Sequence, residues 1–388
     1  MSKAETSFEA MDEAGVRAAV ASARRVVVKV GSSSLASARG GLDVAALDAL
    51  VDALAAQRLA GREIILVTSG AIAAGCEPLG LTRRPVDLAQ QQAAAAVGQG
   101  LLIARYTQAF ARHGITVAQV LVTVADIARR ASYTNALRTF GALTRLGVTP
   151  IVNENDTVAT REIRFGDNDR LAALVAELVR ARALVLLSDV DALYTDRPDQ
   201  LGASRVSFVP RSTSVAVDVT RVGASGVGSG GMSSKLEAAR LAAGAGIPVV
   251  LTSCTKVAAA LAGETVGTAF APSSKRRPRR LLWLADASDT QGRLHVDAGA
   301  VTALVSKGAS LLAAGVRRVD GKFSAGDPVE VVGPDGRVIA RGLVGFDADQ
   351  LPPMLGRSSA DLARDLGERF GHEVIHRDDL VLIRKVRV

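Results

Sequence analysis

The chain has 388 residues, of which 48% are hydrophobic and 22% are charged, and its formal net charge is +8. This length exceeds what one ordinary hydrophobic core accommodates, so two domains are expected. Its apolar stretches fall short of the roughly 18 or more residues of a membrane helix, and the polar, acidic stretch Met1–Glu13 lacks the apolar centre of a secretory signal. Only Cys76 and Cys254 are cysteines, which argues against a disulfide framework and fits a cytoplasmic protein without a membrane anchor. We expect both to be small buried side chains.

The positive charge makes nucleic acid a partner to consider. Part of it lies in one run, Lys275–Arg280, which contains a proline. Aromatic residues make up only 3% of the chain, which leaves little material for stacking bases. The run therefore indicates a solvated linker first and an RNA contact second.

The first 270 residues alternate apolar strands with alanine-rich helices, a pattern typical of a mainly parallel sheet between two helical layers. The predicted strands are Val26–Val30, Glu63–Thr68, Thr116–Val122, Thr149–Val152, Leu184–Leu187 and Pro248–Leu251. The predicted helices are Leu42–Leu59, Leu88–Arg112, Asp126–Leu146, Asn168–Arg182 and Ser233–Ala243. The fold class predicted for this part is an α/β three-layer sandwich.

The character of the chain changes near Pro272. Beyond the basic run, two alternating apolar segments, Val329–Val332 and Arg337–Val344, flank the turn sequence Gly333–Gly336. A Pro-Asp-Gly turn between such segments predicts a β-hairpin. We therefore expect domains at residues 20–271 and 291–371, the second small and β-rich, joined by a basic linker at 272–290.

Five clusters of polar residues in the first domain lie where a predicted strand ends or a predicted helix begins. They are Lys29 with Gly31, Thr68–Ala71, Asn153–Asp156, Ser188–Asp191 and Gly166–Asp169. Ligands of open α/β sheets bind beyond the carboxyl ends of the strands. Each cluster alone is more typical of a turn or a helix cap, but five on one edge predict a binding site.

Two scarce lysines indicate the chemistry of that site. Lys29 lies beside Gly31 and a run of serines, and Lys235 closes the glycine-rich stretch Ser225–Lys235. Ammonium groups near exposed backbone N–H groups suit a transferring phosphoryl group, and neither lysine is expected in the core. No GxxxxGK[ST] sequence occurs, so a P-loop enzyme is not indicated. No histidine lies in these loops, and a carboxylate acceptor, already ionised at neutral pH, would need no base.

A dinucleotide-binding site is the rival interpretation, because Gly226, Gly228 and Gly231 satisfy GxGxxG. The preceding residues, Val217–Ser225, include Asp218 and Arg221 and do not form a clean apolar strand. No acidic residue stands about 20 positions later, where a ribose partner is expected. The dehydrogenase interpretation is therefore the weaker one.

Five motifs, taken in order, resemble those of the glutamate 5-kinases of the amino acid kinase family. They span residues 27–33, 67–75, 152–156, 165–169 and 228–235. The tail from about Gly292 to Gly371 looks like a PUA domain, an RNA-associated module. The resemblance covers nearly the whole chain apart from an N-terminal extension of roughly twenty residues.

The resemblance implies an amino acid kinase fold and ATP-dependent phosphorylation of the γ-carboxylate of L-glutamate to glutamyl 5-phosphate, the first step of proline biosynthesis. By motif position, the catalytic residues would be Lys29, Lys235 and Asp169, the last holding the two lysines. The residues that would bind glutamate are Ser69, Gly70, Asn153, Asp156 and Asn168. Those that would bind ATP are Lys29, Gly31, Ser188, Asp189, Ser229, Gly230, Gly231, Met232, Ser233, Ser234 and Lys235. Ser188 stands where threonine is commoner, and it keeps the hydroxyl.

The resemblance also implies Mg²⁺ bridged by the ATP phosphates without a dedicated protein site, feedback inhibition by proline, and assembly into dimers or tetramers. Two alternatives stay open. One is a related carboxylate kinase acting on N-acetylglutamate or aspartate. The other is a mainly RNA-binding protein that acts through its tail and the Lys275–Arg280 run.

Overall fold

The structure is a computed structural model that describes residues 11–35, 41–83, 85–128, 130–158, 168–196, 202–210, 231–273 and 290–383. The chain forms two compact units, a larger one up to Arg276 and a smaller one from Arg277 onward, the latter also including Ala128–Ser132. The predicted basic run 275–280, the residues before the glycine-rich loop at 217–225, and Phe165–Asp167, Ser229 and Gly230 lie outside the described residues.

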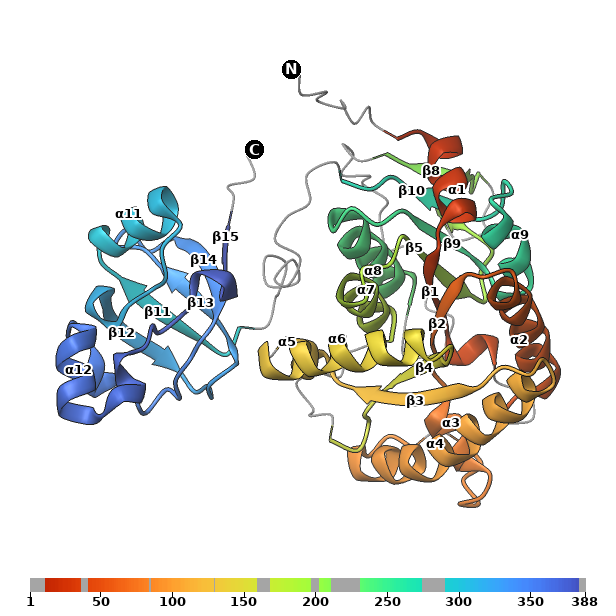
Figure 1. The fold of residues 1–388 in the computed structure, drawn as a ribbon, viewed down its shortest axis with the longest axis horizontal. Coiled ribbons are helices and arrows are strands. Elements are labelled where there is room, and N and C mark those ends of the chain that lie inside the picture. The colour runs from red at the N-terminus through yellow and green to blue at the C-terminus, as the bar shows by residue number, and fades with distance from the viewer. Residues whose placement is uncertain are drawn as a thin grey trace. The chain divides into compact units, whose positions relative to one another are not determined.

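An eight-stranded sheet, in the order β3-β4-β2-β1-β5-β9-β10-β8, forms the centre of the larger unit (Figure 1). Its strands are β1 (Arg25–Val30), β2 (Glu63–Val67), β3 (Val117–Val122), β4 (Thr149–Glu154), β5 (Ala183–Ser188), β8 (Phe208–Val209), β9 (Val249–Ser253) and β10 (Thr268–Phe270). All neighbours pair in parallel except β9 and β10. A separate two-stranded ribbon joins β6 (Leu193–Tyr194) to β7 (Arg205–Val206).

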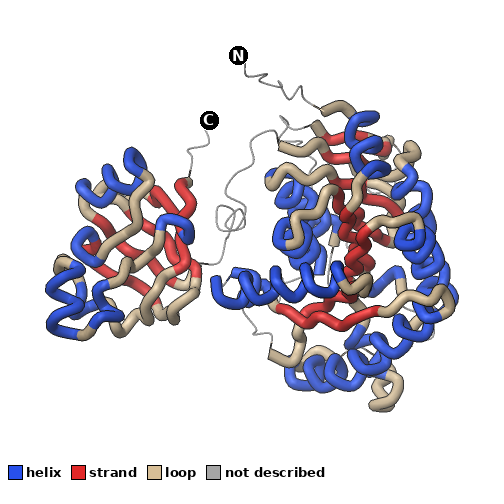
Figure 2. The backbone as a smooth tube through the Cα atoms, in the orientation of Figure 1, coloured by secondary structure: helices blue, strands red, loops and turns tan. Residues whose placement is uncertain are grey.

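Helices cover both faces of this sheet (Figure 2). They are α1 (Glu13–Ser22), α2 (Val44–Leu59), α3 (Ala71–Cys76), α4 (Leu88–Ala111), α5 (Val124–Ala128), α6 (Arg130–Arg145), α7 (Asn168–Leu178), α8 (Met232–Gly244) and α9 (Val257–Ala262). The observed architecture is the predicted three-layer αβα sandwich with a mainly parallel sheet, so the predicted fold class is confirmed.

The alternation of side chains along β1 explains how one lysine reaches the interior. Val26, Val28 and Val30 belong to a hydrophobic core that also contains residues of α1, α2, α4 and α9. Successive residues of a strand point to opposite faces of the sheet. Lys29 therefore lies on the other face, where it meets Asp169 of α7, which also pairs with Lys235 of α8.

The six predicted strands of the first domain are present, two predicted helices need correction, and helices α1 and α9 and strands β6, β7, β8 and β10 were not predicted. The predicted helix Asp126–Leu146 is two helices, α5 and α6. The helix predicted to end at Arg182 ends at Leu178, because Arg180 adopts a left-handed backbone conformation, with φ 55°, that turns the chain toward β5. Helix α1 was not expected in the polar N-terminal extension.

Two glycines allow α3 and α4 to pack backbone to backbone. A Cβ atom on Gly75 would lie 1.9 Å from the carbonyl oxygen of Ala94, and one on Gly98 would lie 1.8 Å from that of Ala71. Real Cβ contacts are much longer, so both positions require glycine. This close crossing fixes α3, whose first residue follows the polar exit of β2.

The smaller unit contains a five-stranded sheet in the order β12-β11-β13-β14-β15. Among its described residues, the strands are β11 (Gly292–Val296), β12 (Val316–Gly321), β13 (Pro328–Val332), β14 (Val338–Leu343) and β15 (Leu380–Leu382), and the α-helices are α11 (Ala298–Lys307) and α12 (Ser359–Leu366). β13 and β14 pair antiparallel across a turn in which Gly336 has φ 75°, so the predicted hairpin is confirmed.

A row of alternating charges crosses this second sheet. Asp320, Arg293, Glu330 and Arg341 lie opposite one another on four successive strands. Cross-strand pairs of opposite charge stabilise a sheet modestly. Glu330, near the middle of this row, is only 7% exposed and pairs with both Arg293 and Arg341.

No helix among the described residues is long and apolar enough to cross a membrane. Cys76 and Cys254 are free and half-buried, where full burial was expected. Burial raises the pKa of the Cys254 thiol to about 11. That thiol is therefore protonated at neutral pH and a poor nucleophile.

Candidate active site at the carboxyl edge of the sheet

The parallel strands β4, β2, β1 and β5 are neighbours in the sheet, so their carboxyl ends share one edge. The polar exits predicted from the sequence therefore fall side by side along this edge. The exits of β4 and β2 form one half, those of β5 and β9 form the other, and Lys29 of β1 lies between them.

A buried carboxylate joins the two lysines at the centre. Lys29 Nζ lies 2.5 Å from Asp169 Oδ1, and Lys235 Nζ lies 3.3 Å from Asp169 Oδ2. Lys29 is 1% exposed, Asp169 is 0% exposed and Lys235 is 5% exposed. Ser234 donates a further hydrogen bond to Asp169 Oδ2 at 3.1 Å. These positions agree with the predicted role of Asp169 in holding both lysines, but both lysines are buried, and the expectation that neither is in the core was wrong.

Local backbone geometry leaves room around these charges. Gly31 follows β1, and a Cβ atom there would lie 3.6 Å from Lys29 Nζ, so the ammonium group reaches the loop that follows the strand. Gly70 precedes α3 with φ 109°, a conformation that favours glycine. Gly231 precedes α8, whose first turn begins without a side-chain cap and carries Met232, Ser233, Ser234 and Lys235. Uncapped N–H groups at a helix start suit an anion.

A chain of hydrogen bonds connects three of the five predicted glutamate-binding residues, Ser69, Asn153 and Asn168. Asn168 Nδ2 donates to Ser69 Oγ at 2.9 Å, and Asn168 Oδ1 accepts from the backbone N–H of Glu154 at 3.3 Å. Asn153 Oδ1 accepts from the same N–H at 2.9 Å. Because Ser69 accepts from Asn168, its own hydroxyl proton remains able to point at a bound anion.

Two residues of α4 contact the ends of β4 and β2 and were missed in the sequence. Gln99 Oε1 accepts from Asn153 Nδ2 at 2.7 Å, and the hydroxyls of Tyr106 and Thr68 are 2.8 Å apart. Burial raises the pKa of Tyr106, so this hydroxyl stays protonated. Gln99 and Tyr106 are seven residues apart and thus share one helix face. In the sequence, a glutamine in an alanine-rich helix carries no signal of such a contact.

Asp156 lies two residues beyond β4 and is half-buried. Next to it, Thr157 donates to Asn155 Oδ1 at 2.6 Å, so the turn after β4 is held by its own side chains. Asp156 therefore stands at the same edge as Ser69 and Asn168, as predicted.

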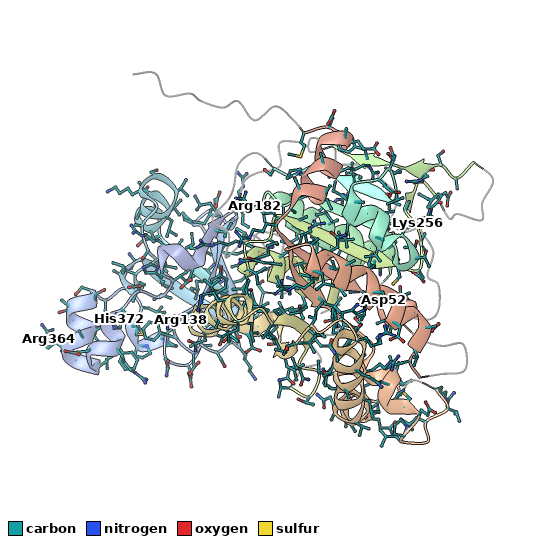
Figure 3. The ribbon with its side chains drawn as sticks, turned by 45° about the vertical axis from the view of Figure 1, so that its right-hand side comes forward. Asp52, Arg138, Arg182, Lys256, Arg364 and His372 are labelled. Carbon is teal, nitrogen blue, oxygen red and sulfur yellow. The ribbon has the colours of Figure 1, made fainter. Side chains whose placement is uncertain are left out.

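The other half of the edge begins at Ser188, whose hydroxyl donates to Asp189 Oδ1 at 2.9 Å. Asp191 follows, accepts from the Tyr194 hydroxyl at 2.9 Å and lies 3.5 Å from Lys256 Nζ (Lys256 is labelled in Figure 3). The hydrogen bond to Asp191 raises the pKa of Tyr194. Hydroxyl, carboxylate and ammonium groups thus alternate along this half of the edge.

The described residues contain no group of three His, Cys, Asp or Glu side chains arranged to hold a metal ion. Mg²⁺ commonly takes one or two carboxylates together with waters and substrate phosphates. Ser188 and Asp189, at the carboxyl end of β5, are compatible with a Mg²⁺ ion that would be bound mainly by substrate phosphates.

Comparisons with known proteins agree with this geometry. Residues 24–253 match the model of the amino acid kinase family, and residues 292–366 match that of the PUA domain. A glutamate 5-kinase of Streptomyces avermitilis is 60% identical over 370 residues, which cover 95% of this chain and 99% of that protein. The chain belongs to the glutamate 5-kinases of the amino acid kinase family.

Further relatives extend the same result. A glutamate 5-kinase of Salinispora arenicola is 59% identical over 369 residues, covering 95% of this chain and all of that protein. Among solved structures, the carbamate kinase of Giardia lamblia bound to AMP-PNP covers 65% of this chain at 17% identity, with a TM-score of 0.48. That score supports no argument about the site. The resemblance read from the five motifs and the tail is confirmed.

Proposed function

We propose that this kinase transfers the γ-phosphoryl group of ATP to the γ-carboxylate of L-glutamate, which gives glutamyl 5-phosphate and begins proline biosynthesis. The observation that carries the proposal is the buried arrangement of Lys29, Asp169 and Lys235 at the centre of the strand edge. A carboxylate flanked by two ammonium groups fixes both cations where charge develops on a transferring phosphoryl group.

The transfer itself needs no base from the protein. A carboxylate oxygen of glutamate forms a bond to the γ-phosphorus while the bond from that phosphorus to the β,γ-bridging oxygen breaks, and ADP leaves with the electron pair. The acceptor is already ionised at neutral pH. Lys29 and Lys235 stabilise the negative charge on the phosphoryl oxygens, and the uncapped first turn of α8 adds backbone N–H donors.

The two halves of the edge divide the substrates between them. Ser69, Gly70, Asn153, Asp156 and Asn168 would bind glutamate, with the Asp156 carboxylate facing its ammonium group. Ser188, Asp189 and the residues around Gly231–Lys235 would bind ATP, together with Ser229 and Gly230. Mg²⁺ would bridge the phosphates, where it neutralises charge and aligns the triphosphate.

The finer properties rest on the resemblance. We propose cytoplasmic location, inhibition by proline at or near the glutamate site, and assembly as a dimer or tetramer. The domain boundaries 20–271, 272–290 and 291–371 also remain proposals, as does RNA binding by the tail.

The deciding experiment measures ADP release with glutamate, N-acetylglutamate and aspartate, with hydroxylamine present to trap an acyl phosphate. We expect turnover and hydroxamate formation with glutamate. Turnover with only one of the other two acids would assign the chain to a related carboxylate kinase. ADP release without hydroxamate would exclude a carboxylate acceptor.

A further inference from the structure

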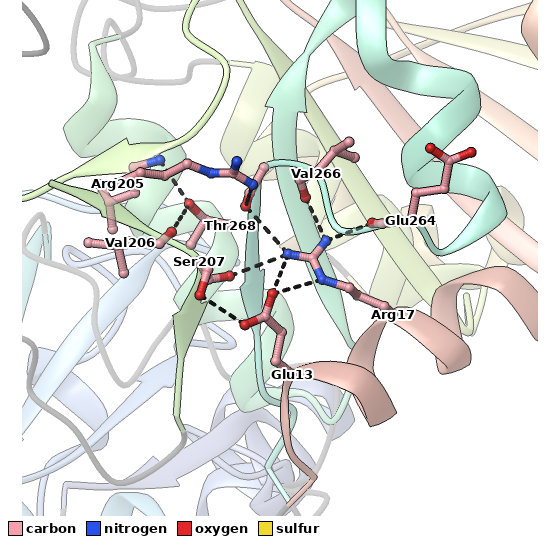
Figure 4. Close-up of polar contacts among 10 residues, drawn as sticks. Glu13, Arg17, Arg205, Val206, Ser207, Glu264, Val266 and Thr268 are labelled. Carbon is pink, nitrogen blue, oxygen red and sulfur yellow. Dashed lines mark hydrogen bonds and ion pairs between the residues drawn. The ribbon is translucent and has the colours of Figure 1, made fainter.

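Helix α1 places a buried arginine against the far edge of the main sheet (Figure 4). Arg17 is 4% exposed. Its Nη1 donates to the carbonyl oxygens of Glu264 and Val266 at 3.0 and 2.5 Å, and its Nη2 donates to that of Gly267 at 3.4 Å. Glu13, one helical turn earlier, balances the charge, with its Oε1 2.7 Å from Nη2. A buried guanidinium needs this many acceptors, since an unsatisfied charge would be costly.

The same pair reaches strand β8, the edge strand of the sheet. Ser207, the residue before β8, donates to Glu13 Oε2 at 2.8 Å, and its carbonyl oxygen accepts from Arg17 Nη2 at 3.5 Å. β8 pairs with β10 at only two positions. So short an edge strand has few ladder contacts of its own, and the contacts from Glu13 and Arg17 help to hold it. We call Glu13, Arg17 and Ser207 the α1 clamp.

A buried threonine connects the residues held by the α1 clamp to the segment that follows β5. Thr268 follows Gly267, is fully buried and starts β10. Its Oγ1 accepts from the backbone N–H of Leu193 at 2.8 Å and donates to the carbonyl oxygen of Val206 at 2.6 Å. It thus fastens both strands of the β6–β7 ribbon to the turn that Arg17 holds.

The ribbon belongs to the nucleotide half of the site. β6 begins four residues after Asp189, and the stretch between them contains Asp191. In the sheet, β10 and β8 lie beyond β5 and β9, whereas Ser69 and Asn153, which are assigned to glutamate, lie at the carboxyl ends of β2 and β4, at the opposite side of β1. A structural change at the α1 clamp is therefore expected to affect the loop after β5 more than it affects Ser69 or Asn153.

We propose that the α1 clamp positions the loop 188–194 for nucleotide binding, so that the N-terminal helix contributes to ATP affinity without touching ATP. Arg17 is the positioning residue, acting through Gly267 and Thr268. The inference rests on the proposed function only in assigning ATP to this half of the edge.

Arg62 supplies a matched control, because it fastens the same helix at its other end. Arg62 donates to the carbonyl oxygens of Val20, Ala23 and Leu261 and to the side chain of Gln57. These contacts dock α1 against α2 and α9 and do not involve residues 205–210. If docking of α1 alone mattered, loss of Arg62 would have the same consequences as loss of Arg17.

The test compares Arg17→Met and Arg62→Met in the full chain by calorimetric titration with ATP and by steady-state kinetics. Residues that act on a ligand without contacting it commonly change a binding equilibrium by about 2- to 30-fold. We expect Arg17→Met to weaken ATP binding within that range, with the glutamate KM within about twofold of the parent. Arg62→Met should lower the melting temperature while ATP affinity stays at the parental value.

Equal ATP affinity in Arg17→Met and the parent, or equal losses in the two variants, would overturn the proposal. Should Arg17→Met not fold, Ser207→Ala decides instead, because it removes only the exposed hydroxyl contact to Glu13. We expect a selective weakening of ATP binding at the low end of the range, and unchanged ATP affinity would again contradict the clamp. Titration with ATP in the absence of glutamate measures ATP affinity whether or not glutamate is the acceptor. If the parent enzyme formed no acyl phosphate, that result would refute only the proposed function.

Discussion

The ion pairs of the two units that differ most are those around Asp169 and those around Arg364. In the larger unit, Lys29 and Asp169 meet in the interior at the end of a parallel strand. In the smaller unit, the side chain of Arg364 is 70% exposed and contacts Asp361 and Asp365 (Figure 3). The hydrogen bond from Ser358 and the contacts with Arg364 lower the pKa of Asp361 without burying it.

This difference shows which charges carry the chemistry. Exposed pairs contribute about 0–1 kcal/mol at most and are screened by salt. A buried pair costs desolvation energy that hydrophobic residues of the same size would avoid. The larger unit maintains such a cluster at the one edge where ligands of its fold bind, which a purely structural core would not require.

The largest effect is expected from the buried lysines. Lys29→Ala and Lys235→Ala should each lower kcat by roughly 10²–10³, the scale for loss of one preorganised charge stabiliser. The glutamate KM should change much less, because the interaction forms mainly as charge develops. Since each change removes a cation from the buried Asp169, we also expect a lower melting temperature. Steady-state kinetics and thermal melts measure both.

Arg364→Ala is the matched control on the surface of the smaller unit. It removes a cation with two carboxylate contacts, yet both kcat and the melting temperature should stay close to the parent. Normal turnover in Lys235→Ala would remove the assignment of α8 to the phosphate, and a loss in Arg364→Ala comparable to that in Lys29→Ala would invalidate the contrast between buried and exposed pairs.

A smaller effect is expected on the glutamate half of the edge. Asp156→Asn keeps the shape of the side chain and removes its charge, so glutamate affinity should fall by about 1.5–3 kcal/mol, the usual scale for a charged hydrogen bond. ATP affinity should barely change. Titration of each substrate separately distinguishes the outcomes, because a loss of ATP binding alone would assign Asp156 to the nucleotide or its metal.

Hydrophobic alternation predicted the layered fold, and the polar strand exits predicted the edge that carries the site. These features are local in sequence, so they can be recognised without coordinates. Lys29, Asp169 and Lys235 are distant in sequence, and the resemblance of motifs suggested their grouping, which no spacing rule would provide. Their burial was not foreseen, because glycine-rich surroundings suggest an exposed loop.

Helix α1 and Gln99 show what sequence patterns leave out. The acidic start of α1 looked like a polar extension, although Val16 and Val20 are fully buried against the main core. The role of Arg17 depends on the backbone carbonyl groups of Glu264 and Gly267, which are nearly 250 residues away in the sequence. Backbone acceptors have no sequence signature, so contacts of this kind emerge only from the folded chain.

A modest stability effect is expected in the smaller unit. Asp297 caps α11 by accepting from the backbone N–H of Ala300 at 2.8 Å. Asp297→Ala should therefore cost about 1 kcal/mol, which is typical of a lost N-cap. Hydrogen exchange of the α11 amides measures it, with those of α7 as the internal reference. Faster exchange in both helices would contradict two separately stable units.

The pH dependence of this cap follows from its hydrogen bonds. The N–H of Ala300, together with Arg317, lowers the pKa of Asp297. A lowered pKa in the folded state means that the contribution is fully present above the unfolded value of about 3.9 and is lost as pH falls through the folded value. The difference between Asp297→Ala and the parent should thus be constant near neutral pH and shrink below about pH 4.

The smallest effect on catalysis is expected from removing the smaller unit altogether. The described residues that we assign to the reaction lie before Pro272, in the unit that extends up to Arg276. A chain ending near Pro272 should therefore melt cooperatively and keep glutamate- and ATP-dependent turnover close to that of the full chain. Its regulation or assembly can still change, since an attached domain can bias either without touching the reacting atoms. Steady-state kinetics on both chains, each checked by a thermal melt, makes the comparison. A shortened chain that melts normally yet cannot phosphorylate glutamate would show that the smaller unit helps to build the site, and the proposed domain boundary would be functionally wrong.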